Sequence, residues 1–195
     1  YYLGEDGSRR SGWVLLEEAT DDPEIVESWY YYDTAGKRVE NEVDRKIQGK
    51  YYTFVDGRMQ TGWFKLPEES QAAEANASAS AESSDAGVSE NADAAAETEN
   101  AAPKTSAPAI ASYQYYDESG ERAEGWRTIE GVDGISEEGE TYKFYFKKGA
   151  PHHADSGLAL FTIDSKKYAF NDRGEMQTGL QQVSVGENET ANFYF

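Results

Sequence analysis

A turn glycine recurs along this chain, and five positions after it comes a second small residue that is followed, in three of the units, by tryptophan. The turn glycines are Gly7, Gly36, Gly57, Gly120 and Gly174. The glycine-tryptophan pairs stand at 12-13, 62-63 and 125-126. Self-similarity at a period of roughly twenty to thirty residues is typical of repeat architectures, in which one unit cannot bury its apolar face alone. We therefore expect small, similar units that stack.

Residues 51–63 contain one complete unit. An aromatic stretch with alternating faces runs into the pair Asp56-Gly57 and out through a short polar segment to Gly62-Trp63. Alternation followed by Asp-Gly predicts a β-hairpin. We expect its second strand to close on Gly62-Trp63, with the glycine allowing close approach of a neighbour. A further unit at Gly149 carries an insertion that includes His152, so the chain should form six imperfect hairpins.

Composition favours an all-β fold. The apolar area is carried by 8 Phe, 4 Trp and 14 Tyr rather than by long aliphatic runs. A chain rich in rings and turn residues argues against a helical bundle or a doubly wound α/β enzyme. The fold class predicted from the sequence is thus an all-β β-hairpin repeat solenoid.

Charge limits the partners. With 37 acidic against 18 basic residues the formal net charge is −19. Nucleic acid or an anionic membrane surface would need a basic patch, so we expect neither as a partner, and a cationic or neutral ligand is easier to accommodate. There is no cysteine, which excludes a disulfide scaffold. No stretch has the length and hydropathy of a membrane span, so we expect no membrane insertion.

A change in composition divides the chain. Residues 67–112 hold 16 Ala, 8 Ser and nine acids against one lysine, with no aromatic residue. Such a segment cannot bury enough apolar area to fold, so we predict a disordered acidic linker. The predicted organisation is three hairpins in residues 1–66, the linker in 67–112, and three hairpins plus a truncated strand in 113–195. Because the chain opens and closes on strand-like residues, we expect it to be a fragment of a longer protein.

Side-chain alternation separates the two faces of each aromatic strand. Residues six and four positions before the turn glycine are mostly apolar and are predicted to form the stacking core, as at Tyr30 and Tyr32. The same count selects Lys143 and Tyr145 in the unit at Gly149, and Tyr52 and Phe54 join them after a one-residue deletion. The opposite face varies between units, as binding positions would.

The repeats resemble the cell-wall-binding repeats of bacterial surface proteins, which include choline-binding and glucan-binding modules. The elements that match are the three Gly-Trp pairs, the strand 29–32 and the Gly-x-Met-x-Thr-Gly segments that begin at Gly57 and Gly174. The resemblance covers about three quarters of the chain. It implies a β-solenoid with ligands held between consecutive hairpins by aromatic rings.

The resemblance also implies particular site residues. A first cage would join Trp63, Tyr113 and Trp126, provided that the linker loops out. A second would use Trp13 with Trp29 and be open where Glu42 replaces a ring. A third would use Trp126 with Tyr142.

Several readings of these rings stay open. Aromatic faces around a desolvated pocket attract a quaternary ammonium group, and they also stack on sugars, so ring count alone does not separate choline from glucan. The same tryptophans could simply pack between hairpins. His152 and His153 are adjacent and lack metal-ligand spacing, so we expect no metal. We expect no cofactor either, and no pattern of a catalytic nucleophile stands out.

The sequence therefore predicts a non-catalytic, extracellular binding module. It would anchor a larger surface or secreted protein to cell-wall polysaccharide or to the choline of teichoic acid. The alternative is a structural stalk or spacer whose repeats no longer bind.

Overall fold

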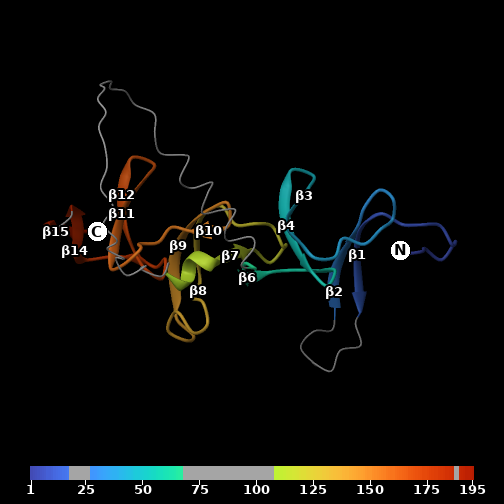
Figure 1. Cartoon of the computed structure of the whole chain (residues 1–195), viewed down its shortest axis with the longest axis horizontal. Coiled ribbons are helices and arrows are strands. Elements are labelled where there is room, and N and C mark those ends of the chain that lie inside the picture. The colour runs from blue at the N-terminus through green and yellow to red at the C-terminus, as the bar shows by residue number, and fades with distance from the viewer. Residues whose placement is uncertain (18–26, 68–107, 187–188) are drawn as a thin grey trace, which may run out of the picture.

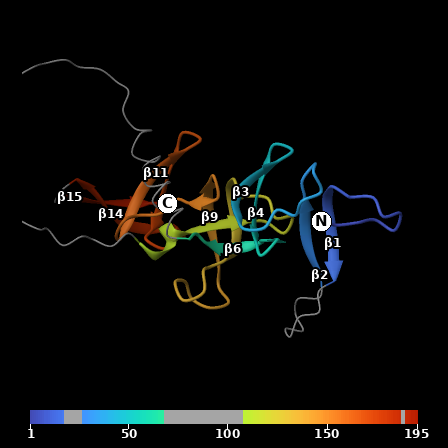
Figure 2. The same cartoon turned by 45° about the vertical axis from the view of Figure 1, so that its right-hand side comes forward.

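The computed structural model describes residues 1–17, 27–67, 108–186 and 189–195. The described chain is all-β apart from a short 3-10 helix, η1 (Ala109–Ser112), and its strands form six antiparallel sheets of two or three strands. The sheets follow one another along the long axis from the N-terminal to the C-terminal end, a succession that both views show (Figure 1, Figure 2). The predicted all-β hairpin-repeat fold is confirmed. In the described ranges, no helix is long and apolar enough to cross a membrane.

Each sheet is built on a hairpin of two longer strands. The first three hairpins are β1 (Gly12–Glu17) with β2 (Glu27–Tyr32), β3 (Glu42–Ile47) with β4 (Lys50–Val55), and β6 (Gly62–Lys65) with β7 (Tyr113–Tyr116). The last three are β8 (Gly125–Glu130) with β9 (Thr141–Lys147), β11 (Leu158–Ile163) with β12 (Lys166–Asn171), and β14 (Leu180–Gly186) with β15 (Glu189–Tyr194). Short third strands, β5 (Arg58–Met59), β10 (Ala150–Pro151) and β13 (Met176–Gln177), extend the sheets of β4, β9 and β12.

The hairpin partners differ from those predicted from the sequence. The turn at Asp56-Gly57 joins β4 only to the two-residue strand β5, and Trp63 lies in β6, which pairs with the next aromatic strand, β7. The prediction that Gly62-Trp63 closes the hairpin of residues 51–63 is therefore wrong. Strand β4 pairs over most of its length with β3, ahead of it in the chain, and this longer ladder decides the hairpin.

The third hairpin is formed from both sides of the acidic segment. Lys65 pairs with Tyr113, and the Leu66 N–H donates to the Ser112 carbonyl oxygen at 2.8 Å. The two repeat regions thus meet in one sheet. Most of the predicted linker, residues 68–107, lies outside the described residues, and the division at residues 66 and 112 stays a prediction.

The core is made of rings from the aromatic strands. Tyr30, Tyr32, Tyr52 and Phe54 are all buried, as the count from the turn glycine predicts. In the unit at Gly149 the prediction was wrong by one residue. Phe144 and Phe146 are 0% and 1% exposed, whereas Lys143 is exposed and Tyr145 is half-buried.

Turn length explains this shift. The unit at Gly149 turns on two residues, Lys148 and Gly149, both with positive φ (53° and 79°). The turn after β2 is longer, and its Asp33 carboxylate accepts hydrogen bonds from the N–H groups of Ala35 and Lys37. Counting back from the glycine therefore reaches opposite faces of the strand in the two kinds of unit.

A buried polar network joins the second hairpin to the third. The Tyr116 hydroxyl accepts a hydrogen bond from Thr53 at 2.7 Å and lies 3.0 Å from an Asp44 carboxylate oxygen and 2.7 Å from the Gln114 side-chain oxygen. Arg122 forms an ion pair with the same Asp44, at 2.6 Å. These contacts fix the spacing of two consecutive hairpins, and the aromatic clusters depend on that spacing.

Candidate ligand-binding site

Each Gly-Trp pair begins a strand and directs its indole toward the following hairpin. Gly12, Gly62 and Gly125 all have positive φ, of 98°, 74° and 72°, a conformation that glycine adopts without strain. A Cβ atom at any of the three would meet no neighbouring atom within 4 Å. These glycines therefore serve the backbone turn rather than the close approach of a neighbour that we expected from the sequence.

The Trp13 cluster consists of Trp13, Trp29, Tyr31, Tyr52 and Phe54. Trp13 pairs across the hairpin with Tyr31, and their ring centroids are 5.1 Å apart. Its indole also packs on two rings of the next hairpin, with centroid distances of 4.8 Å to Tyr52 and 5.8 Å to Phe54. Trp29 meets it edge-on at 6.5 Å. Two consecutive hairpins thus contribute to one cluster.

The Trp63 cluster consists of Trp63, Tyr115, Phe144 and Phe146. Trp63 pairs with Tyr115 at 5.3 Å between centroids and packs on Phe144 and Phe146 of β9 at 5.2 and 5.5 Å. Its indole N–H donates to the Glu130 carbonyl oxygen at 2.9 Å. This hydrogen bond fixes the plane of the indole.

The Trp126 cluster consists of Trp126, Tyr145, Tyr168 and Phe170. Trp126 pairs with Tyr145 at 5.0 Å and packs on Tyr168 at 4.7 Å and Phe170 at 6.0 Å. The same scheme of a cross-strand ring plus two rings from the next hairpin therefore occurs three times along the molecule.

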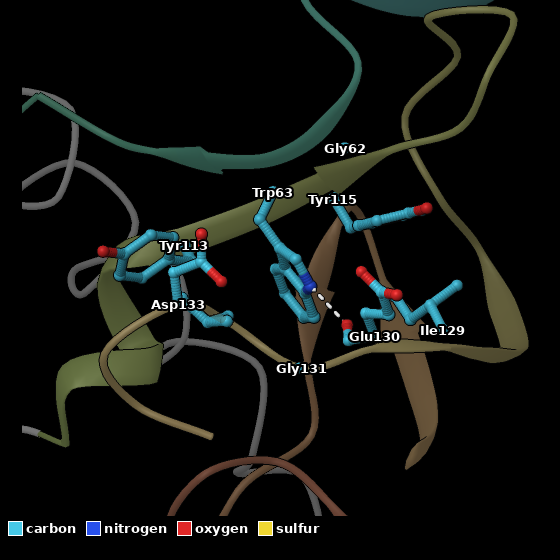
Figure 3. A pocket seen from close by; sticks show the side chains of 9 residues that line it. Gly62, Trp63, Tyr113, Tyr115, Ile129, Glu130, Gly131 and Asp133 are labelled. Atoms are coloured by element: carbon cyan, nitrogen blue, oxygen red, sulfur yellow. Dashed lines mark hydrogen bonds between the residues drawn. The ribbon is translucent and has the colours of Figure 1, made fainter. Parts of the chain in front are cut away.

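A cavity of about 540 Å³ opens beside the Trp63 cluster, and we call it the Trp63 cavity. Figure 3 shows the side chain of Trp63 extending from the paired strands toward the segment around Gly131. Two acidic residues, Glu130 and Asp133, lie on this segment and are exposed. The full lining is Gly62, Trp63, Tyr113, Tyr115, Ile129, Glu130, Gly131, Val132 and Asp133. Aromatic faces thus share the cavity with carboxylates.

A second cavity, of about 340 Å³, lies at the Trp13 cluster and is called the Trp13 cavity. It is lined by Trp13, Trp29, Tyr52, Met59, Glu118 and Ser119. Glu118 and Ser119 belong to the turn after β7 and reach the cavity from the third hairpin. This cavity too combines rings with an exposed carboxylate, that of Glu118.

Tyr52 and Tyr115, one in each cavity, have hydroxyl groups that hold their protons more firmly than a free phenol does. Burial, followed by the charge of nearby carboxylates, raises the pKa of Tyr52 and of Tyr115 above the usual value for a phenol. Their rings therefore keep the electron-rich face of a protonated phenol, which is the face that attracts a cation.

The structure groups the site residues predicted from the sequence as follows. Trp63 and Tyr113 line one cavity, and Trp13 and Trp29 line another. Trp126 centres a separate cluster. Tyr142, which we expected beside Trp126, packs with the Trp63 cluster, and its ring centroid is 6.4 Å from that of Phe144.

We expected the cage of Trp13 and Trp29 to be open at Glu42, where a ring is missing, but Glu42 does not line the cavity that the structure shows there. Its carboxylate pairs with Arg45 at 3.0 Å, and the space beside Trp13 is lined instead by Tyr52, Met59 and Glu118.

Sequence reasoning missed Tyr115, Met59 and the acids Glu118, Glu130 and Asp133. Tyr115 could have been found from the correct hairpin pairing, because it lies directly across from Trp63. The acids carried no distinguishing signal among 37 acidic residues.

His152 takes part in ring packing. The His152 ring is parallel to that of Tyr145 within 6°, at 5.1 Å, and lies 4.5 Å from that of Phe161. Burial lowers the pKa of His152, and the nearby Lys147 lowers it further. Among the described residues, no group of three or more His, Cys, Asp or Glu side chains could hold a metal ion.

No protein family model and no curated protein sequence matches this chain. Its fold is similar to that of CbpF in complex with ipratropium, with a TM-score of 0.49, 20% identity, and coverage of 93% of this chain and 43% of that one. Choline binding protein F from Streptococcus pneumoniae, in the presence of a peptidoglycan analogue, gives 0.47 and 21%, with 93% and 41% covered. The modular Cpl-1 endolysin, complexed with a peptidoglycan analogue, gives 0.29 and 15%, with 89% and 39% covered.

The chain thus spans less than half the length of each of these three proteins. At these identities and TM-scores the likeness concerns the fold alone. The first two solved structures are of choline-binding protein F, and their family is the one that the repeats resemble.

Proposed function

We propose that this chain is a binding module for organic cations, with the Trp63 cavity as its main site. The observation that carries the proposal is the presence of three rings, Trp63, Tyr113 and Tyr115, in one cavity with the carboxylates of Glu130 and Asp133. The Trp13 cavity, with its rings and Glu118, is the second site.

The chemistry of the Trp63 cavity suits a quaternary ammonium group. Each ring face contributes about 0.5 to 2 kcal/mol of cation–π attraction, depending on how far the site excludes water. Carboxylates at the edge add a Coulomb attraction that a neutral ligand of the same shape does not feel. The volume of about 540 Å³ is in the range of small-molecule sites.

Choline is the organic cation that the family resemblance suggests. The biological role we propose is anchoring of a larger surface or secreted protein, outside the cell, to the choline of wall teichoic acid or to another wall polymer. In this role the chain has no catalytic function of its own.

The test is a calorimetric titration with choline, and in parallel with 3,3-dimethyl-1-butanol, in which carbon replaces the charged nitrogen. We expect choline to bind saturably and the neutral isostere to bind much more weakly. Tyr113→Ala should weaken choline binding by roughly fivefold, which corresponds to the loss of one ring contact of about 1 kcal/mol. Tyr113 suits this test because it lines the cavity without belonging to the buried core.

The matched control is Tyr194→Ala, which removes a ring that is 83% exposed and lies in β15, at the far end of the stack. It should leave the affinity unchanged. Equal binding of choline and its neutral isostere would contradict the cation proposal. Soluble α-glucan and peptidoglycan fragments, titrated in the same way, then show whether the rings stack on sugar instead.

A structural spacer is the second candidate. It is favoured by the packing of each central tryptophan against rings of the next hairpin, since such contacts stabilise the stack without any ligand. If no ligand class gives a saturable response, the spacer is the better account.

A further inference from the structure

Three of the ring contacts in the Trp126 cluster repeat those of the Trp13 cluster. The cross-strand ring lies at 5.1 Å and 63° from Trp13 and at 5.0 Å and 68° from Trp126. The next ring lies at 4.8 Å and 64° in one and at 4.7 Å and 65° in the other. The stacked phenylalanine lies at 5.8 Å and 29°, and at 6.0 Å and 22°. On ring geometry alone, the two clusters should accept the same ligand.

One position distinguishes them. The residue two places before the cross-strand ring lies on the same face, diagonal to the tryptophan. It is Trp29 beside Trp13 and Tyr113 beside Trp63, and both of these rings line their cavities. Beside Trp126 the corresponding residue is Lys143.

Lys143 reaches over the tryptophan. Its Nζ lies 4.7 Å from the centroid of the Trp126 ring, within the distance at which an ammonium group is attracted to an indole face. The Trp63 and Trp13 cavities are lined in part by acidic residues, whereas Lys143 places a positive charge over Trp126. An incoming cation would have to displace the Lys143 ammonium and would also be repelled by it.

We propose that Lys143 is an internal cation that occupies the Trp126 cluster and excludes from it the organic cations bound at the Trp63 and Trp13 cavities. Lys143 thereby determines which of the three similar clusters bind ligand, and hence how many ligands the chain binds. This inference rests on the proposed function, since it concerns the same ligand class.

The four tryptophan indole N–H groups allow a test of each cluster separately by NMR, after assignment through single Trp→Phe variants. Tetramethylammonium chloride is titrated into the wild type and into Lys143→Ala, with sodium chloride as the ionic control. In the wild type we expect the Trp63, Trp13 and Trp29 signals to shift and the Trp126 signal to stay. In Lys143→Ala the Trp126 signal should also titrate, with an affinity within about tenfold of the Trp13 site, because three ring contacts match and only the ring of Trp29 has no counterpart.

Lys37→Ala is the matched control, since it removes one exposed lysine from a turn of another hairpin and should leave Trp126 silent. The spectrum of Lys143→Ala without ligand should match that of the wild type outside the Trp126 signal, which verifies the fold.

Two outcomes would overturn the inference: a Trp126 signal that titrates as strongly in the wild type as in Lys143→Ala, or one that is silent in both. If Trp126 titrates only in Lys143→Ala while Trp13 and Trp63 are silent in both proteins, Lys143 has the proposed role and the proposed function at the two cavities fails.

Discussion

At the scale of single residues, the Tyr116 hydroxyl is the centre of the contact between the second and third hairpins. It is fully buried and lies within hydrogen-bond distance of the side chains of Thr53, Asp44 and Gln114. Burial raises the pKa of Tyr116 far above that of a free phenol, so the hydroxyl keeps its proton and can donate to Asp44 or Gln114.

Tyr116→Phe should therefore destabilise the protein by about 1 to 3 kcal/mol, because buried polar groups would lose a hydrogen-bond partner. Urea unfolding followed by tryptophan fluorescence measures the change. Tyr194→Phe, at a residue that is 83% exposed, is the control and should be neutral. Equal stability of Tyr116→Phe and the wild type would show that the network does not hold the hairpins together.

His152 should make stability depend on pH. The folded protein holds the pKa of His152 below its ordinary value of 6.5, mainly through burial. As the pH falls through that value, the unfolded chain takes up a proton before the folded protein does, so the free energy of unfolding decreases. His152→Phe should reduce this loss between neutral pH and about pH 5, measured by unfolding at several pH values. His153→Asn should keep most of it, and an unchanged pH dependence in His152→Phe would count against the assignment.

At the scale of elements, the turns do more than connect strands, because one hairpin stacks on the turn of another. The Gly149 N–H donates to the Ala123 carbonyl oxygen, and its own carbonyl oxygen accepts from Tyr115, both at 2.9 Å. A Cβ atom at Gly149 would lie 2.6 Å from Cγ of Arg122, whose guanidinium is tied to Asp44.

Gly149→Ala should consequently cost more than Gly139→Ala. Both glycines have positive φ, of 79° and 76°, so both substitutions pay roughly 1 kcal/mol for the backbone conformation. A Cβ atom at Gly139 meets nothing within 4 Å, so only Gly149→Ala adds a clash. Thermal unfolding of the two variants side by side gives the comparison. Matching melting temperatures would mean that the turn is free to move away from its neighbour.

The sequence was sufficient for the kind of element but not for its partners. Aromatic alternation and turn glycines are local signals, and they predicted strands, turns and the all-β fold. Strand β4 could form its main ladder with β3, ahead of it in the chain, or with the segment that follows its turn. Composition does not show which of these two ladders is the longer one. The prediction that Tyr142 lies beside Trp126 failed for a similar reason. The turn after β9 has two residues where the turn after β2 is longer, and this difference moves every side chain of the strand to the opposite face.

At the scale of the whole molecule, charge should tune ligand binding. The whole chain has a formal net charge of −19, and acidic residues also line the Trp63 cavity. We expect choline affinity to fall as salt rises from about 0.01 M to about 1 M, over which the Debye length shrinks from roughly 30 to roughly 3 Å. Calorimetry at several salt concentrations measures this, and any binding of 3,3-dimethyl-1-butanol should not weaken. Parallel weakening of both ligands would show that the effect is not electrostatic.

The pleat of β9 ties two neighbouring clusters to a single backbone. Phe144 and Phe146 extend from one face and pack on Trp63, and Tyr145 between them extends from the other and packs on Trp126. A slip of this strand by one residue would exchange the two faces, so both clusters would be lost together. A mutation that shifts β9 should therefore disrupt the Trp63 cluster and the Trp126 cluster at the same time. An inserted or deleted residue there is more damaging than any single substitution, because it reverses the facing of the whole strand rather than removing one ring.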